Sequence, residues 1–222
     1  MRPTVARALG ALCAAAPLLA QTIVPVEQEP AHKVVFENAL VRVIDAALPV
    51  GHATLYHTHS RDNLPVAVAD GRVATTVLGR ASVESAVKTG QVSFAAGGYT
   101  HEVRNVGPTP LHFIDVELLT SAPAAASSSP AASPLVGHVL ELSNSCVVVR
   151  RVIVAPGRRL EAHKHAGAVL EVLVEGDAVA HGAGIAAPVA AGAFEWHSEG
   201  AVDAVRNAGR VPYEVIEVEW IK

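Results

Sequence analysis

The apolar residues of this chain gather in short segments of strand length. Segments such as 34–44, 64–69 and 113–119 alternate or run apolar, and no window keeps a sustained helical period. Glycine and proline separate these segments, as at the pair Gly97-Gly98. Many short strands with glycine turns between them are typical of an all-β sandwich or barrel. We therefore predict an all-β protein with few helices.

Length and composition support a folded core and argue against some partners. The 222 residues allow one large domain or two of about 100 residues each. Half of the residues are hydrophobic and only 4% are aromatic, so Val, Ala, Leu and Ile must fill the core. The net charge of −4 offers no basic surface for nucleic acid or anionic lipid.

The first twenty residues have the pattern of a cleaved export signal. Arg2 and Arg7 precede a small apolar run, 8–20, that is too short for a bilayer span of about 20 apolar residues. A packed N-terminal helix is the alternative interpretation. We expect residues 1–20 to be removed and the rest to be periplasmic or secreted, with no membrane contact after cleavage. Cys146 is then the single remaining thiol, so no intramolecular disulfide can form, and we expect it to be a small buried residue.

A spacer divides the rest of the chain into two similar halves. Residues 121–134 contain only Ser, Ala and Pro, a composition typical of an extended linker. His57 and His59 recur 106 positions later as His163 and His165. Further along the offset becomes 102, where Asn105 recurs as Asn207. A long run of matches in constant register indicates two similar domains, at 21–120 and 135–222.

Histidines carry the candidate chemistry. On a strand, residues i and i+2 point to the same face, so His57 and His59 can converge on one ion while Thr58 points away. His101, after the turn at Gly97-Gly98, can supply a third imidazole from a distant strand. Three protein ligands with an open position are what a catalytic metal requires. The alternative is that His57 and His59 are surface histidines on a half-exposed strand. The second pair, His163 and His165, argues against this alternative.

These residues resemble the two sequence motifs of the cupin superfamily. The first-motif positions are Gly51, His57-Thr58-His59 and Gly71, and the second-motif positions are Gly90, Ala96 (where proline is usual), Gly98, His101 and Asn105. The second half repeats them at Gly157, His163, His165 and Gly176, and then at Gly192, Ser198, Gly200 and Asn207. The resemblance covers about residues 32–120 and 136–221. It implies a bicupin, with two tandem double-stranded β-helix (jelly-roll) barrels and a metal held inside by His57, His59 and His101.

The chain departs from the cupin pattern at the usual metal-binding glutamate. That register gives Leu64 in the first half, with Asn63 and Asp62 beside it, and Val169 or Leu170 in the second. The first site is then three imidazoles, a set that suits Fe, Zn, Ni or Cu about equally.

The second half also lacks the third histidine, since Asp203 takes its place. His163, His165 and Asp203 could form a two-His, one-carboxylate metal site, and Glu171 could also reach inward. The other interpretation, which we favour, is a decayed site in a structural barrel.

The other histidines match no position of the repeat in this comparison. We expect His52, His112, His138 and His181 to lie at the surface or to support a site from behind its ligands, not to be ligands themselves. For His197 we expect an exposed loop, with a position lining a pocket as the alternative.

Three functions fit these residues. The first is a metal-dependent, dioxygenase-like enzyme acting on a small molecule. The second is a non-catalytic protein that binds a small ligand or a metal, and the third is a non-redox isomerase. No phosphate-binding loop or nucleophile elbow is present in the sequence, which disfavours nucleotide-dependent and triad-hydrolase chemistry. The resemblance also implies that two copies can pair as a homodimer through sheet edges.

Overall fold

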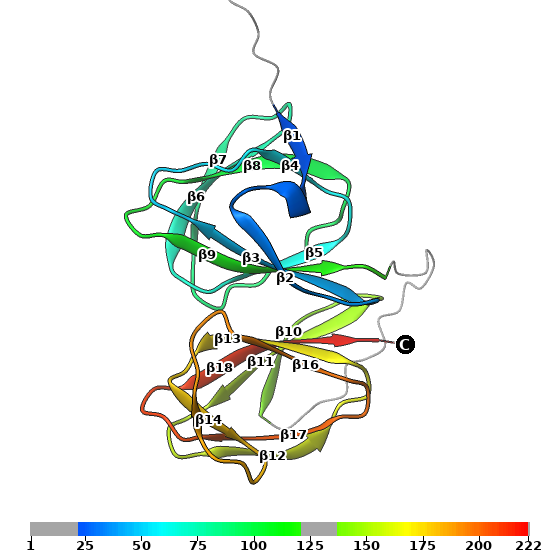
Figure 1. Ribbon diagram of the computed structural model, residues 1–222, viewed down its shortest axis with the longest axis vertical. Coiled ribbons are helices and arrows are strands. Elements are labelled where there is room, and N and C mark those ends of the chain that lie inside the picture. Colours follow the sequence, from blue (N-terminus) through cyan, green and yellow to red (C-terminus); the bar gives the residue numbers. More distant parts are fainter. Residues whose placement is uncertain (1–21, 121–136, 222) are drawn as a thin grey trace, which may run out of the picture.

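The computed structural model describes residues 22–120 and 137–221, and these residues form two β barrels (Figure 1). The one helical element within them is a short 3-10 turn, η1 (Val26–Gln28). Nowhere in the described ranges is there a helix with the length and apolar character needed to cross a membrane. The predicted export signal at 1–20 and the predicted linker at 121–134 lie outside the described residues.

The N-terminal barrel consists of two facing sheets. One has the strand order β1-β4-β8-β6-β7 and the other β2-β3-β9-β5. The strands are β1 (Ile23–Pro25), β2 (His32–Glu37), β3 (Val41–Leu48), β4 (Tyr56–His59), β5 (Asn63–Ala67), β6 (Gly71–Val77), β7 (Val83–Val87), β8 (Tyr99–Asn105) and β9 (Leu111–Leu118).

The C-terminal barrel repeats this arrangement, except that β1 has no counterpart and β16 is added to the other sheet. Its sheets have the orders β10-β11-β18-β13-β16 and β12-β17-β14-β15. The strands are β10 (His138–Ser143), β11 (Val147–Val154), β12 (Arg159–Lys164), β13 (Val169–Glu175), β14 (Ala178–His181), β15 (Ala187–Pro188), β16 (Phe194–His197), β17 (Val202–Asn207) and β18 (Tyr213–Trp220). The repeat in the sequence is thus a repeat of topology, and the all-β prediction of two tandem jelly-roll barrels is confirmed.

One predicted strand is in fact two. Segment 34–44 is interrupted at Asn38, whose side-chain oxygen accepts hydrogen bonds from the main-chain N–H groups of Leu40 (2.8 Å) and Val41 (3.1 Å). Asn144 makes the same turn in the second half, accepting from Cys146 and Val147. The apolar residues on both sides concealed the turn, because a side-chain cap can reverse the chain within three residues.

A buried asparagine holds the loop after β8. The Asn105 side-chain amide donates to the carbonyls of Leu48 (3.0 Å) and Thr109 (2.8 Å), and its oxygen accepts from the N–H of Gly107 (2.9 Å). Asn207 makes three equivalent bonds after β17, to Val154, Val211 and Gly209. These bonds satisfy buried main-chain groups and explain why both halves have asparagine at this position.

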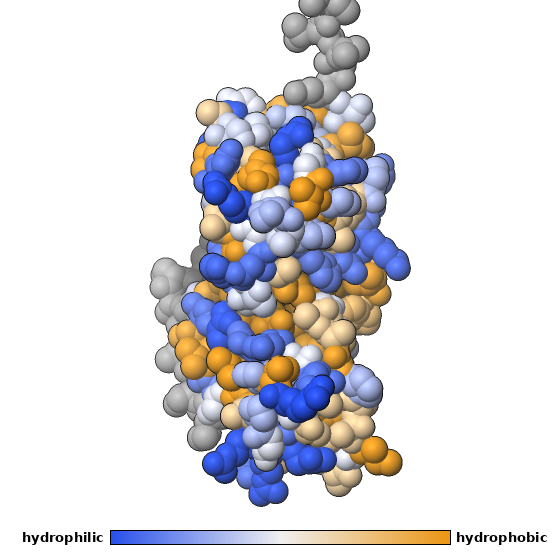
Figure 2. Space-filling model, turned by 90° about the vertical axis from the view of Figure 1, so that its left-hand side faces the viewer, coloured by the Kyte–Doolittle hydropathy of each residue, from blue (hydrophilic) through white to orange (hydrophobic). Residues whose placement is uncertain are grey.

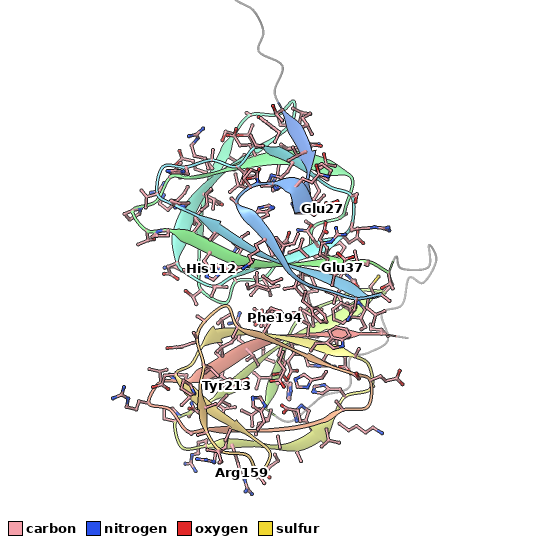
Figure 3. All side chains as sticks on the ribbon, in the orientation of Figure 1. Glu27, Glu37, His112, Arg159, Phe194 and Tyr213 are labelled. Carbon is pink, nitrogen blue, oxygen red and sulfur yellow. The ribbon has the colours of Figure 1, made fainter. Side chains whose placement is uncertain are left out.

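The two barrels share a hydrophobic core between them. Sheet β2-β3-β9-β5 faces sheet β10-β11-β18-β13-β16 in Figure 1, and one cluster of buried residues combines members from both. Phe194 lies at this junction in Figure 3, and its ring centroid is 5.9 Å from that of Phe36. Cys146 belongs to the same cluster, which confirms the prediction that it is buried.

This contact determines which side chains point into the barrels. Along β9, Ile114, Val116 and Leu118 lie in the shared core, so the alternate residues Asp115 and Glu117 take the opposite face. Both acidic residues are buried. The apolar face of each of these sheets is therefore directed at the other barrel, and the more polar face is directed inward.

The outer surface has no such separation. On the face shown in Figure 2, hydrophilic and hydrophobic residues are interspersed over both barrels.

Candidate metal centre

Two paired strands bring three histidines together inside the N-terminal barrel. His57 and His59 lie on one face of β4, and His57 is directly opposite His101 on β8. Ring centroids are 4.4 Å apart for His57 and His101, and 5.2 Å apart for His59 and either of the others. One ligand nitrogen from each ring lies within 4.8 Å of the other two. The structure thus places all three predicted ligands in one cluster.

The hydrogen bonds at the rings leave nitrogen lone pairs available. The Nδ1 of His57 lies 3.0 Å from the carbonyl oxygen of Leu55, an arrangement in which Nδ1–H donates and Nε2 keeps its lone pair. The Nδ1 of His59 and the Nε2 of His101 are buried and have no hydrogen-bond partner within the described part of the chain. Buried ring nitrogens without partners are costly unless a ligand binds them, so this donor set fits a metal ion.

The surroundings keep the imidazoles neutral. Burial, together with the neighbouring histidines, lowers the pKa of His59 to about 2 and that of His101 to about 3. Burial also lowers the pKa of His57, against a raising effect of its bond to Leu55. Neutral imidazole is the form that binds metal, so the site is in its ligand form across the physiological pH range.

The three rings line a cavity of about 280 Å³. Its other walls are largely apolar, with Leu48, Val73 and Leu111 among them. This volume is at the small end of ligand pockets, which span roughly 300–1,000 Å³. The cavity therefore has the size to hold a small molecule.

Buried acidic residues lie beside His59. The Oδ2 of Asp115 is 3.6 Å and the Oε1 of Glu117 is 3.8 Å from the His59 Nδ1. Burial raises the pKa of Asp115 to about 7, although a hydrogen bond from the Asn63 side chain (2.8 Å) opposes the rise. Tyr99 donates to the Oδ1 of Asn63 at 3.1 Å, which completes a chain of polar groups along one side of the cavity. Asp115 can therefore exchange a proton near neutral pH beside the cluster.

The structure shows what occupies the position where cupins usually have a metal-binding glutamate. Leu64 is fully buried in the core shared by the two barrels, so it does not point toward the histidines. Its neighbour Asn63 lines the cavity instead. The side chain on the cavity side of β5 is thus an amide, which leaves the cluster without a carboxylate at this position.

A fourth histidine was missed. His32 on β2 lines the same cavity, and its ring centroid is 4.7 Å from that of His57. Its Nδ1 lies 3.2 Å from the carbonyl oxygen of Val26, and burial lowers its pKa to about 4. The sequence held a signal for it, because His138 follows His32 by 106 positions, the offset that relates the two histidine pairs.

In the C-terminal barrel the predicted ligands lie in different groups. His163 is directly opposite Asp203 on the neighbouring strand, but these two and His165 are not brought together as one ligand group. His163 groups with His138 and Glu217, whereas His165 groups with Glu171 and Glu217. Asp203 faces His181 instead, at 3.5 Å from its Nδ1, and this contact raises the pKa of His181.

The structure shows the positions of two other histidines, and the expectation of an exposed loop for His197 was wrong. His138 is buried behind Glu217 and not at the surface, since its side chain is 1% exposed and its Nε2 lies 3.1 Å from the Oε1 of Glu217. His197 lies on strand β16 and points inward, with its Nε2 3.5 Å from the Oε1 of Glu171. Residue type and spacing alone did not show that the polar face of these strands is the inner one. His52 is exposed, as expected.

Comparisons with known proteins agree on the fold. No family model and no curated protein matches the chain. Among solved structures, AerE from Microcystis aeruginosa has a TM-score of 0.61 at 12% identity, covering 87% of this chain and 99% of its own. Oxalate decarboxylase from Bacillus subtilis, whose Mn(II) centres are the subject of that structure, has a TM-score of 0.57 at 12% identity, covering 82% of this chain and 69% of its own. A cupin 2 conserved barrel domain protein from Leptotrichia buccalis has a TM-score of 0.54 at 9% identity, covering 86% of this chain and 88% of its own.

These similarities show the fold. The chain has the cupin fold, present twice. Its N-terminal barrel contains a three-histidine cluster that could bind a metal.

Proposed function

We propose that this protein is a metal-dependent enzyme that acts on a small organic molecule inside its N-terminal barrel. The observation that carries the proposal is the convergence of His57, His59 and His101 on the wall of a cavity of about 280 Å³. Three neutral imidazoles with an open side are the arrangement of catalytic metal sites. The Mn(II) centres of the similar Bacillus subtilis oxalate decarboxylase support a metal in this fold, and add Mn to Fe, Zn, Ni and Cu as ions to test.

Different residues of the N-terminal site have different roles in this proposal. A divalent ion held by the three histidines would polarise a carbonyl or enolic oxygen of the substrate or, if it is iron, supply dioxygen chemistry. The apolar walls at Val73 and Leu111 exclude water from the substrate. Asp115 holds or releases a proton beside His59, because its pKa of about 7 places both protonation states within reach.

The reaction class that we favour is oxidative, similar to that of three-histidine cupin dioxygenases. The cupin resemblance supports this choice, and the absence of a carboxylate among the three ligands agrees with it. The predicted signal at residues 1–20 would place the enzyme in the periplasm or outside the cell.

The metal content of the purified protein tests the proposal. Protein isolated from its native compartment should contain about one ion per chain at this site, and His57→Ala with His101→Ala should remove it. His52→Ala is the matched control, because that side chain is exposed and the variant should keep its metal. Unchanged metal content in the double variant would exclude the site.

The identity of the ion then separates the candidate functions. Iron together with uptake of dioxygen in the presence of candidate small molecules supports the oxidative enzyme. Zinc or nickel without dioxygen uptake favours the non-redox isomerase. A protein that binds a small molecule but neither takes up dioxygen nor converts the molecule is a binding protein, and the enzymatic proposal is then wrong.

A further inference from the structure

The interior of the C-terminal barrel contains a second cluster of ionisable groups. His165 on the loop after β12, Glu171 on β13 and Glu217 on β18 are 1%, 3% and 1% exposed. One ligand atom from each lies within 4.8 Å of the other two. A hydrophobic interior would be expected of a barrel that had kept only a structural role, so this cluster needs a physical explanation.

The two glutamates are placed against each other by strand register. Glu171 and Glu217 are directly opposite on the antiparallel pair β13 and β18, with both side chains on the same face. Directly opposed like charges destabilise a sheet, and burial makes an uncompensated carboxylate far more costly. Burial raises the pKa of Glu171, and a positive partner at the pair would favour the charged form of both carboxyl groups.

Several atoms of the cluster lack a partner among the residues that the structure describes. Neither ring nitrogen of His165 makes a hydrogen bond, and neither does the Oε2 of Glu217. Each glutamate also contacts another histidine. The Oε1 of Glu217 lies 3.1 Å from the Nε2 of His138, and the Oε1 of Glu171 lies 3.5 Å from the Nε2 of His197.

We propose that the C-terminal barrel binds a divalent cation between His165, Glu171 and Glu217. The cation balances the two buried carboxylates and supplies the missing partner of the imidazole. His138 and His197 then act as positioning residues, each beside the Oε1 of one glutamate. Glu171 and Glu217 take the place of the Asp203 ligand expected from the sequence, because Asp203 faces His181.

The donor set predicts a preference different from that of the N-terminal cluster. Two carboxylates and one imidazole are harder ligands than three imidazoles, so this site should bind Mn(II) comparatively better than the N-terminal cluster does, within the general order in which Cu(II) binds more tightly. His163 lies beside the site, with its Nδ1 3.2 Å from the carbonyl oxygen of Glu161 and its Nε2 buried without a partner in the described residues.

Mn(II) binding to the full chain tests the proposal. In the His57→Ala, His101→Ala background the N-terminal cluster is disabled, so bound Mn(II), measured by the loss of the free Mn(II) EPR signal, reports the C-terminal site. We expect about one Mn(II) per chain, and a loss of roughly tenfold or more in affinity when Glu171→Gln and Glu217→Gln are added. Glu161→Gln is the control, because its side chain is exposed and paired with Arg159.

Each outcome has a defined meaning. No binding of Mn(II) in the histidine-variant background, or equal affinity with and without the two glutamine substitutions, overturns the proposal. If the glutamine variant does not fold, thermal unfolding of the histidine variant alone decides, since Mn(II) should raise its midpoint and an unchanged midpoint contradicts the site. The reverse test, in which Glu171→Gln with Glu217→Gln keeps one ion, reports the N-terminal cluster separately, so the two proposals can fail independently.

Discussion

Asp115 gives the sharpest test of how the N-terminal barrel is built. Its carboxyl group is 5% exposed, lies beside His59 and accepts a hydrogen bond from Asn63. Burial raises its pKa from the ordinary value of 3.8 to about 7. Replacement by asparagine keeps the shape and the acceptor oxygen but removes the ionisation.

The sign of the effect follows from proton binding in the two states. Below pH 3.8 the carboxyl group is protonated in both the folded and the unfolded chain. Between that pH and about 7 the unfolded chain releases the proton while the folded protein keeps it, so rising pH favours unfolding. At about 1.4 kcal/mol for each pKa unit, the shift costs the wild type at most about 4 kcal/mol by neutral pH.

Asp115→Asn should therefore gain stability relative to wild type as the pH rises. We expect the difference in free energy of unfolding to change by about 1 to 4 kcal/mol between roughly pH 4 and pH 7.5. Urea unfolding followed by circular dichroism, on metal-free protein, measures it. The histidines are present in both proteins, so their contributions cancel in the difference.

A matched control separates burial from charge. Glu84 is exposed on β7, and Glu84→Gln should give a difference that stays within about 0.5 kcal/mol over the same range. If the Asp115→Asn difference is equally flat, the carboxyl group is not held protonated in the folded barrel. The role of Asp115 as a proton carrier would then be wrong.

Three further predictions concern stability. Asn105→Ala and Asn207→Ala should each lower the free energy of unfolding by about 2–4 kcal/mol in urea, because each loses three buried hydrogen bonds; a loss below about 0.5 kcal/mol would contradict this account. Leu170→Ala, in the core shared by the barrels, should cost about 2–5 kcal/mol and lower the urea midpoint of both barrels together; two separated transitions would show that the barrels are not coupled. In the Asp115→Asn background, which removes the opposing titration of Asp115, metal-free protein should lose stability as the pH falls below about 6.5, because the low pKa values of His59 and His101 mean that the unfolded chain takes up protons first; an equal urea midpoint at about pH 5 and pH 7 would exclude it.

Local rules were enough to predict the duplicated fold and the three-histidine cluster. Strand periodicity placed His57 and His59 on one face, and the glycine turn before β8 pointed to His101. These inferences hold because side-chain direction along a strand depends only on neighbouring residues. His32 and His138 are related by the same offset of 106 positions, so the same reasoning could have identified His32.

The acidic groups in the interiors could not be located in the same way. The alternation of Ile114, Asp115, Val116 and Glu117 shows two faces, but it does not say which face is inside a barrel. The usual expectation assigns the apolar face to the interior of a barrel. Here that face packs against the other barrel, so the polar face became the interior, and only the contact between the halves decides this.

The shared core also has a consequence for how the two halves could diverge. Residues such as Val116 and Val218 form the contact, whereas Asp115 and Glu217 occupy the opposite faces of the same strands. Substitutions inside one barrel therefore leave the hydrophobic core between the two barrels intact. A duplicated protein of this architecture can change the residues inside one barrel while the interior of the other barrel stays the same, because the contact between the barrels is formed by a separate set of side chains.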